Sequence, residues 1–349
     1  MKRLLSLVIV LSLALTLYGA AETGPIIVSI GDSYASGEGI EPFFGQELPV
    51  NEKIHDQDWL AHRSALSWPA LLRFDGLDGT TGENKGKLLK NESGKYELVQ
   101  EGNWFFVASS GAVINHLYTT QRKSANVRSG FSRVKAAEDI YPQLEIFDAL
   151  DACGLKADYV TVMLGGNDMG FGWVIALGLQ NTVFGSGETE QYSLEDLISS
   201  ATSTFDFDGG VKARLTQAYR DISEAAGPQA TLIVVGYPTL LNEEGSALFG
   251  AEESRLINEA TKWFNGEIEN IVNGLNAEGM KICFVSVEEP FYGHEAYCQD
   301  AYINPIILGS KAEDLDTTSA MSGYSMHPNA TGAAAIAQSV QQKIDEITK

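Results

Sequence analysis

Ser33, Gly111, Asn167 and His327 are widely spaced residues whose types together could perform nucleophilic acyl transfer. This chemistry needs a nucleophile, a base within hydrogen-bond reach, and donors placed where the oxyanion develops. The first three residues each follow a short apolar run, and His327 stands just before the last helical segment. In an open parallel sheet, the residues that follow the strands meet at the edge where ligands bind. We therefore expect all of them to converge on one site.

Each residue also has a simpler interpretation when it is taken alone. The turn Gly31-Asp32-Ser33 could be ordinary turn chemistry, with Asp32 or Ser33 capping a helix. Gly111 could permit close packing of a strand against a helix, and Asn167 could stabilise a turn. His327 could be a structural histidine that helps to start the last helix. Catalysis is favoured because the residues occur together, each at a predicted strand end or helix start.

Apolar runs rich in β-branched residues predict the strands that hold these residues. The strands are expected at 26–30, 104–108, 159–164, 231–236 and 281–287. Helical spacing predicts helices at 64–72, 133–150, 211–225, 253–275 and 331–347. Strands alternating with helices indicate a parallel sheet that is covered on both faces. We expect an α/β fold with three layers, α/β/α, around a five-stranded parallel sheet in a flavodoxin-like arrangement.

The remaining segments are expected to be loops that shape the site. Residues 40–62 predict a surface loop, 169–206 an insertion beside a substrate groove, and 288–323 a long loop before the last helix. A solvent-exposed hairpin is expected from 87–89 and 96–99, on either side of Asn-Glu-Ser-Gly at 91–94.

The N-terminal segment has the pattern of a signal peptide. Lys2 and Arg3 precede the uncharged run 4–17, and small residues precede a predicted cleavage after Ala21. The run is short for a membrane span, and no cysteine near the cleavage point suggests a lipid anchor. We expect a signal peptide over 1–21, one domain with loop insertions over 22–349, and export to the extracellular space or periplasm without a stable membrane anchor.

Charge, cysteines and absent motifs exclude several classes of protein. The net charge of -22 makes nucleic acid and anionic membrane surfaces poor partners. Three cysteines suggest one disulfide, with Cys283 and Cys298 as the expected pair, and one buried thiol at Cys153. The chain has no Walker loop, Rossmann glycine fingerprint or zinc-ligand spacing, so we expect no cofactor and no metal. The absence of Gly-x-Ser-x-Gly argues against the α/β-hydrolase fold.

The joint pattern resembles the SGNH hydrolases, also called the GDSL family, whose four blocks centre on Ser, Gly, Asn and His. The blocks in this sequence are Gly31-Asp32-Ser33, Ser110-Gly111-Ala112, Gly165-Gly166-Asn167-Asp168 and His327-Pro328-Asn329. Further segments resemble the secreted lipase and esterase branch of the family: Arg63-Ser64, Trp68-Pro69, Gly236-Tyr237-Pro238 and Phe291-Tyr292-Gly293-His294. The resemblance implies the SGNH hydrolase fold over nearly the whole mature chain.

The resemblance also implies a role for each block. Ser33 would be the nucleophile and His327 its general base, then its general acid. The backbone N–H groups of Ser33 and Gly111 and the side-chain amide of Asn167 would form the oxyanion hole, and Asp32 would support the turn. The implied activity is a secreted serine esterase or lipase acting on small-molecule or lipid esters. The alternatives are a polysaccharide or phospholipid deacylase with the same machinery, or a non-catalytic cell-surface binding protein on the same fold.

One position departs from the family pattern. The family usually has an aspartate three residues before the histidine, and that position here is Tyr324. Some secreted members use a main-chain carbonyl instead. We therefore expect the carbonyl of Tyr324, or of a residue close to it, to accept a hydrogen bond from the ring of His327. Asp314 and Asp316 are alternative carboxylates that could fold back as the acid.

Overall fold

The computed structural model describes residues 24–90, 93–94, 96–172 and 194–349. The predicted signal peptide at 1–21 and the middle of the predicted insertion at 169–206 lie outside the described residues. Within those residues, no helix is long and apolar enough to cross a membrane.

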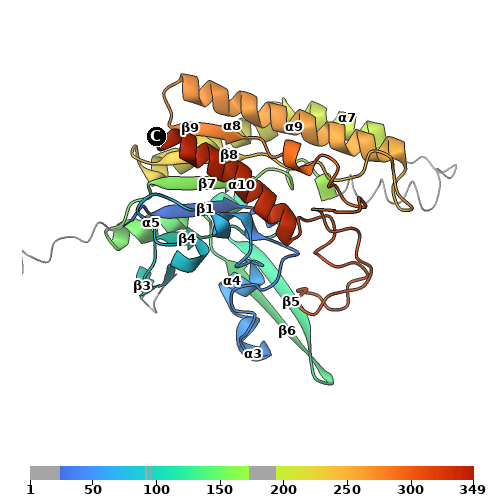
Figure 1. Ribbon diagram of the computed structural model, residues 1–349. Helices are drawn as coiled ribbons and strands as arrows, with labels where there is room; N and C mark the ends of the chain where they lie inside the picture. Colours follow the sequence, from blue (N-terminus) through green and yellow to red (C-terminus); the bar gives the residue numbers. More distant parts are fainter. Residues whose placement is uncertain (1–23, 91–92, 95, 173–193) are drawn as a thin grey trace, which may run out of the picture.

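A five-stranded parallel sheet lies at the centre of the molecule (Figure 1). Its strands are β1 (Ile27–Gly31), β4 (Trp104–Phe106), β7 (Tyr159–Met163), β8 (Thr231–Val235) and β9 (Ile282–Val285). The spatial order is β4-β1-β7-β8-β9, so the first strand in the chain lies between the second and the third. This is the predicted flavodoxin-like order, and its reversal beside β1 opens a crevice where α/β proteins bind ligands.

Helices and short helical turns surround the sheet. The longer helices are α5 (Glu145–Ala152), α7 (Leu194–Phe205), α8 (Val211–Ala226), α9 (Ala251–Ala277) and α10 (Ala330–Ile347). The short ones are α2 (Ser33–Ser36), α3 (Val50–Lys53), α4 (Gln57–Leu60), and the 3-10 turns η1 (Trp68–Leu71), η2 (Gly82–Asn84), η3 (Ile114–Leu117) and η4 (Glu289–Phe291). Helix α8 packs against α9, α5 and α7, whereas α10 packs against η1.

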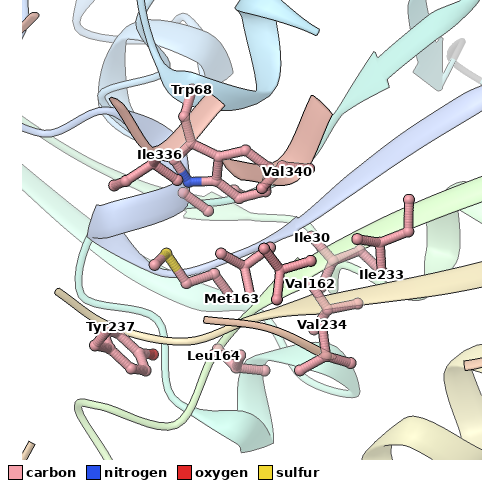
Figure 2. Close-up of a cluster of buried hydrophobic side chains, with 14 of the residues drawn as sticks. Ile30, Trp68, Val162, Met163, Leu164, Ile233, Val234, Tyr237, Ile336 and Val340 are labelled. Carbon is pink, nitrogen blue, oxygen red and sulfur yellow. The ribbon is translucent and has the colours of Figure 1, made fainter. Parts of the chain in front are cut away.

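The core explains why the strands could be predicted as continuous apolar runs. Every residue of β1 is buried, because helices cover both faces of the sheet. Figure 2 shows Trp68 from η1 lying with Ile336 and Val340 from α10 over the strands that carry Ile30 and Val162. Each fully buried side chain of this kind stabilises the fold by about 1.5 to 3 kcal/mol relative to exposure.

The predicted helix at 133–150 is wrong over most of its length. Residues 121–140 form an antiparallel hairpin, β5 (Gln121–Ser129) and β6 (Ser132–Ile140), and only the end of the segment is helical, as α5. Val127 lies opposite Val134 and Ala125 opposite Ala136, so apolar residues alternate along both strands. That period of two buries one face of the hairpin, which helical spacing does not explain.

The predicted surface loop at 40–62 is also wrong, because it contains α3, α4 and a second small core. This core is formed with the hairpin and consists of Phe43, Ile54, Trp59, Leu60, Ala125, Val127, Ile140 and Tyr324. The segment predicted as a helix at 64–72 is the shorter turn η1. The one predicted hairpin is present, as β2 (Lys87–Lys90) and β3 (Tyr96–Gln100), which pair antiparallel.

The predicted Cys283–Cys298 disulfide is absent, since all three cysteines are free. Cys283 lies on β9 within reach of the charges of Lys343 and Glu346 on α10. Cys298 instead points its thiol at the carboxylate of Glu295, with the sulfur 3.7 Å from Oε2. The two thiols therefore have different surroundings, although a short segment joins them.

Candidate active site

Ser33 stands at the carboxyl end of β1, where the strand turns directly into α2. The turn needs glycine at position 31, because Gly31 has a φ of +154° and an added Cβ would lie 2.4 Å from the carbonyl oxygen of Met163. Asp32 caps α2 by accepting a hydrogen bond of 3.0 Å from the backbone N–H of Tyr34. This geometry fixes Ser33 at the edge of the sheet.

One cavity of about 310 Å³ brings Ser33, Gly111, Asn167 and His327 together in its wall. These are the residues that the sequence places at separate strand ends and before the last helix. Among the described residues, neither the backbone N–H of Ser33 nor that of Gly111 donates a hydrogen bond, so both are free to meet a ligand. The wall therefore combines a hydroxyl, an imidazole and unpaired N–H donors.

His327 is held by the backbone that precedes it. Its ring Nδ1 lies 3.0 Å from the carbonyl oxygen of Ser325. A carbonyl can only accept, so Nδ1 carries the proton and Nε2 is the basic nitrogen. Met326 has a φ of +62°, a left-handed conformation that belongs to this tight turn. Burial is the largest influence on the pKa of His327 and lowers it below its usual value.

The carbonyl that accepts from the ring is therefore that of Ser325, a residue close to Tyr324, and not that of Tyr324 itself; the sequence-based expectation included both. The Tyr324 carbonyl accepts from the backbone N–H of His327 instead, at 3.3 Å. Neither alternative acid contacts the ring. Asp314 accepts hydrogen bonds from the hydroxyl of Ser322 and the backbone N–H of Gly323, and Asp316 accepts from Thr318 and Asn126.

Glu38 and His62 form a buried pair beside His327 that the sequence did not indicate. His62 Nδ1 lies 2.7 Å from Glu38 Oε2, and both side chains are almost completely buried. Glu38 lines the same cavity as His327. Burial alone would raise the pKa of Glu38, but the charge and hydrogen bond of His62, with a smaller contribution from His327, lower it to about 2. Glu38 is therefore a charged carboxylate in the wall of the cavity.

Asp32 connects the serine turn to the asparagine turn through Tyr237. The Tyr237 hydroxyl donates to Asp32 Oδ2 at 2.6 Å and accepts from the backbone N–H of Gly166 at 3.0 Å. Burial raises the pKa of Asp32 to about 7, although the Tyr237 hydrogen bond opposes that shift. Tyr237 comes from the segment Gly236-Tyr237-Pro238, which directly follows β8.

Asn167 belongs to the third block and ties it to the second block. One N–H of its amide donates to the carbonyl oxygen of Ala112 at 2.9 Å. The neighbouring Asp168 accepts from the backbone N–H of Ile114 at 2.9 Å and from Arg214 at 2.6 Å. These bonds fix the Asn167 amide beside Gly111. The carbonyl of Ala112 accepts only one of the two amide N–H groups, and the second does not bind it.

Arg63 anchors the strand that leads to Gly111. Its guanidinium donates to the carbonyl oxygens of Ala108 at 2.8 Å and Val107 at 3.1 Å, and it pairs with buried Asp58 at 2.8 Å. Lys85 pairs with the other oxygen of the same carboxylate at 2.8 Å, so Asp58 holds two buried cations. A buried arginine that binds two carbonyls holds the end of β4 in place.

Comparison with known proteins finds similarity over most of the chain. The family model of GDSL-like lipase/acylhydrolases matches residues 27–340. An extracellular lipase from Streptomyces rimosus is 20% identical, with a TM-score of 0.57, covering 92% of this chain and 100% of that one. Phospholipase A1 from Streptomyces albidoflavus NA297 is 19% identical, with a TM-score of 0.57, covering 92% and 99%. These structures share the fold, and no curated protein sequence matches the chain.

Proposed function

The chain belongs to the GDSL-like lipase/acylhydrolase family and is an ester-hydrolysing enzyme, and we propose that it acts as a secreted serine esterase or lipase through an acyl-enzyme on Ser33. The observation that carries this proposal is the shared cavity wall of Ser33, Gly111, Asn167 and His327. Each group in that wall can take one part of the reaction.

The proposed reaction has two halves that use the same residues. His327 Nε2 takes the proton of the Ser33 hydroxyl as its oxygen attacks the ester carbonyl carbon. The tetrahedral intermediate collapses when the imidazolium returns that proton to the leaving alcohol, which leaves the acyl group on Ser33. Water then attacks the acyl-enzyme with His327 as base, and the acid is released.

The oxyanion is proposed to lie between the backbone N–H groups of Ser33 and Gly111 and the free N–H of Asn167. The two backbone donors have no partner among the described residues, which supports this role. Asn167 is held at one side by Ala112, so its orientation is set before substrate binds. Donors fixed in advance stabilise the developing charge without reorganisation.

The orienting role of the usual aspartate is proposed to be divided between two groups. The Ser325 carbonyl holds the ring tautomer through Nδ1, at 3.0 Å, but it carries no full charge. Glu38 carries the negative charge and stabilises the imidazolium from inside the cavity wall, without a direct hydrogen bond to the ring. We therefore assign Glu38 as a positioning residue, paired with His62.

The apolar part of the cavity wall supports an acyl chain as the group bound there. Phe171, Leu240, Ile306, Met321 and Met326 line it. A polysaccharide or phospholipid deacylase would use the same machinery, and a binding protein without turnover would keep the cavity. The proposal also includes a single domain over 22–349, which is exported after residues 1–21 are removed. The mass of the protein recovered from the culture medium tests this cleavage.

A fluorophosphonate that reacts with activated serines tests the nucleophile. We expect stoichiometric labelling of the wild type and none of Ser33→Ala, with Ser319→Ala, on a neighbouring loop, as the labelled control. A series of chromogenic esters from acetyl to long-chain acyl then measures substrate preference. Absence of both labelling and hydrolysis in a folded wild-type protein would favour the binding protein instead.

A further inference from the structure

The β5–β6 hairpin ends in a tip with an unusual composition. Its strands pair from Gln121 opposite Ile140 to Ser129 opposite Ser132, and the tip between them is Gly130-Phe131. The Phe131 side chain is fully exposed, at 113% of its reference area. Figure 1 shows this tip projecting away from the body of the molecule. An aromatic ring with no packing partner contributes nothing to the core.

Basic residues surround this aromatic tip in a strongly acidic protein. Residues 124–137 contain Arg128, Arg133 and Lys135 and no acid, whereas the whole chain has a net charge of -22. The hairpin's ion pairs are at its base, Arg122 with Asp139 and Glu138 with His55. In the part of the chain that the structure describes, none of the three distal bases forms an ion pair. Arg133 donates to Thr317 Oγ1 at 3.3 Å, and its charge contributes to lowering the pKa of the nearby Asp316, whereas no acid among the described residues acts on Arg128 or Lys135 in this way.

The placement of these charges costs hairpin stability. Arg128 lies directly opposite Arg133 across the strands, and like charges at paired positions repel. Arg128, Arg133 and Lys135 share the outward face, since Ala125 and Val127 occupy the alternate, buried positions. A repulsive arrangement on a solvent face does not help folding, which points to a role in binding an anion-rich surface.

The hairpin is joined to the rim of the cavity. The backbone N–H of Asn126 donates to the carbonyl of Leu315 at 2.7 Å, and that of Thr317 donates to Asn126 at 3.2 Å. The same loop carries Leu308, which is 80% exposed and bridges to Met321. Met321 is 42% exposed and lines the cavity that holds Ser33 and His327. Exposed apolar side chains therefore lie on the loop that links the hairpin to the cavity mouth.

We propose that the β5–β6 tip docks on an anionic lipid surface, with Phe131 in the interface and Arg128, Arg133 and Lys135 against the headgroups. Aromatic side chains with adjacent bases are the usual elements of interfacial binding. The choice of a lipid surface rests on the proposed function, because lipid esters are presented at such surfaces. A tip that projects from the body can make this contact while the cavity mouth stays beside it.

The overall negative charge does not prevent this contact. The hairpin is buried as far as Val127, and residues 128–133 beyond it extend for about 10 Å. The Debye length in physiological salt is about 8 Å, so most acidic groups of the body are partly screened from a surface that touches the tip. The sequence-based expectation that anionic membranes are poor partners describes the average charge of the chain and not this local group.

Cosedimentation with lipid vesicles tests the proposal on the mature protein without any need for turnover. Vesicles of phosphatidylcholine alone are compared with vesicles that also contain phosphatidylglycerol. We expect binding to the anionic vesicles that weakens with added salt. The triple variant R128S/R133S/K135S is expected to bind about 100-fold more weakly. Phe131→Ser is expected to bind about tenfold or more weakly.

Phe207→Ser is the matched control, since Phe207 is also an exposed aromatic, at 73%, but lies outside the hairpin. It should bind vesicles like the wild type, and all variants should hydrolyse a soluble short-chain ester equally. Failure of the wild type to bind anionic vesicles, equal binding to both vesicle types, or a loss in Phe207→Ser as large as in Phe131→Ser would overturn the proposal. Failure of the proposed function would appear separately, as absent ester hydrolysis in a protein that still binds.

Discussion

Replacing Glu38 by glutamine removes a buried negative charge near His327 while keeping the size of the side chain. The amide oxygen of glutamine can still accept from His62, so the contact of 2.7 Å is preserved. In the wild type, the charge of Glu38 opposes the burial that lowers the pKa of His327. In Glu38→Gln we expect the pKa of His327 to fall further, and its imidazolium to be harder to form when Ser33 attacks.

The size of the effect follows from Coulomb's law in a partly screened site. Glu38 and His327 line one cavity, and Glu38 Oε1 lies 3.2 Å from where a Cβ on Gly323 would stand, in the turn before His327. At an effective dielectric of about 20, opposite charges ~6 to ~8 Å apart attract by about 2 to 3 kcal/mol. Loss of that attraction slows kcat by about 30- to 100-fold.

Glu38 also makes stability depend on pH. Its pKa is lowered from 4.5 to about 2 in the folded protein, a difference that corresponds to about 3 kcal/mol. A lowered carboxyl pKa stabilises the fold above the unfolded value, and that contribution disappears as the pH falls from 4.5 through 2. Glu38→Gln should lack this loss on acidification, which urea unfolding at several pH values measures.

The kinetic assay is kcat/KM against pH with a soluble p-nitrophenyl ester. We expect the acid limb of Glu38→Gln to move to lower pH and kcat to fall. Glu313→Gln is the matched control, because Glu313 is a buried carboxylate paired with Lys53 at 2.7 Å. It should lower stability without moving the acid limb. A folded Glu38→Gln enzyme with the wild-type acid limb and kcat would refute the assignment of Glu38.

Three further substitutions test the site. Asn167→Ala should lower kcat by about 100- to 1000-fold with little change in KM, because it removes an oxyanion donor; unchanged kcat would exclude Asn167 from the hole. Tyr324→Phe should keep most activity and lose about 1 kcal/mol of stability, since its hydroxyl donates to Glu41 at 3.0 Å while its backbone serves the histidine turn; a collapse of kcat would contradict this. Asp32 has a pKa raised from 3.8 to about 7, so wild-type stability should fall by about 4 kcal/mol as the pH rises through that range. In Asp32→Asn, the free energy of unfolding measured with urea should depend less steeply on pH. A dependence as steep as that of the wild type would show that Asp32 ionises freely.

The sheet and the meeting of the four candidate residues in one cavity wall could be predicted because both depend on short-range signals. Strands buried on two faces must be apolar at every position, so β1 and β7 appear as continuous runs. Parallel strands place their carboxyl ends at one edge of the sheet. Ser33 and Asn167 therefore come close together, because β1 and β7 are neighbours in the strand order. No knowledge of individual contacts was needed for either inference.

The β5–β6 hairpin could not be predicted in this way because its pattern satisfies two periods at once. Val134 and Ala136 are separated by two positions, yet residues further along to 150 continue with helical spacing into α5. Residues 132–140 form a strand because they pair with β5, which lies earlier in the chain. Ala125 and Val127 of β5 are buried in the second core. Helix spacing within one segment carries no information about such a partner.

The carboxylate that stabilises the protonated ring of His327 could not be predicted from the sequence either. An acid is normally sought three residues before the histidine, where this chain has Tyr324. Glu38 instead lies five residues after Ser33, and it becomes a candidate only because the fold buries it against His62 and in the cavity wall. The tautomer is set by a carbonyl two residues before the ring, and the charge by a carboxylate from the other end of the chain. A missing aspartate in the sequence is therefore compatible with an intact catalytic histidine, because orientation and charge need not come from the same residue.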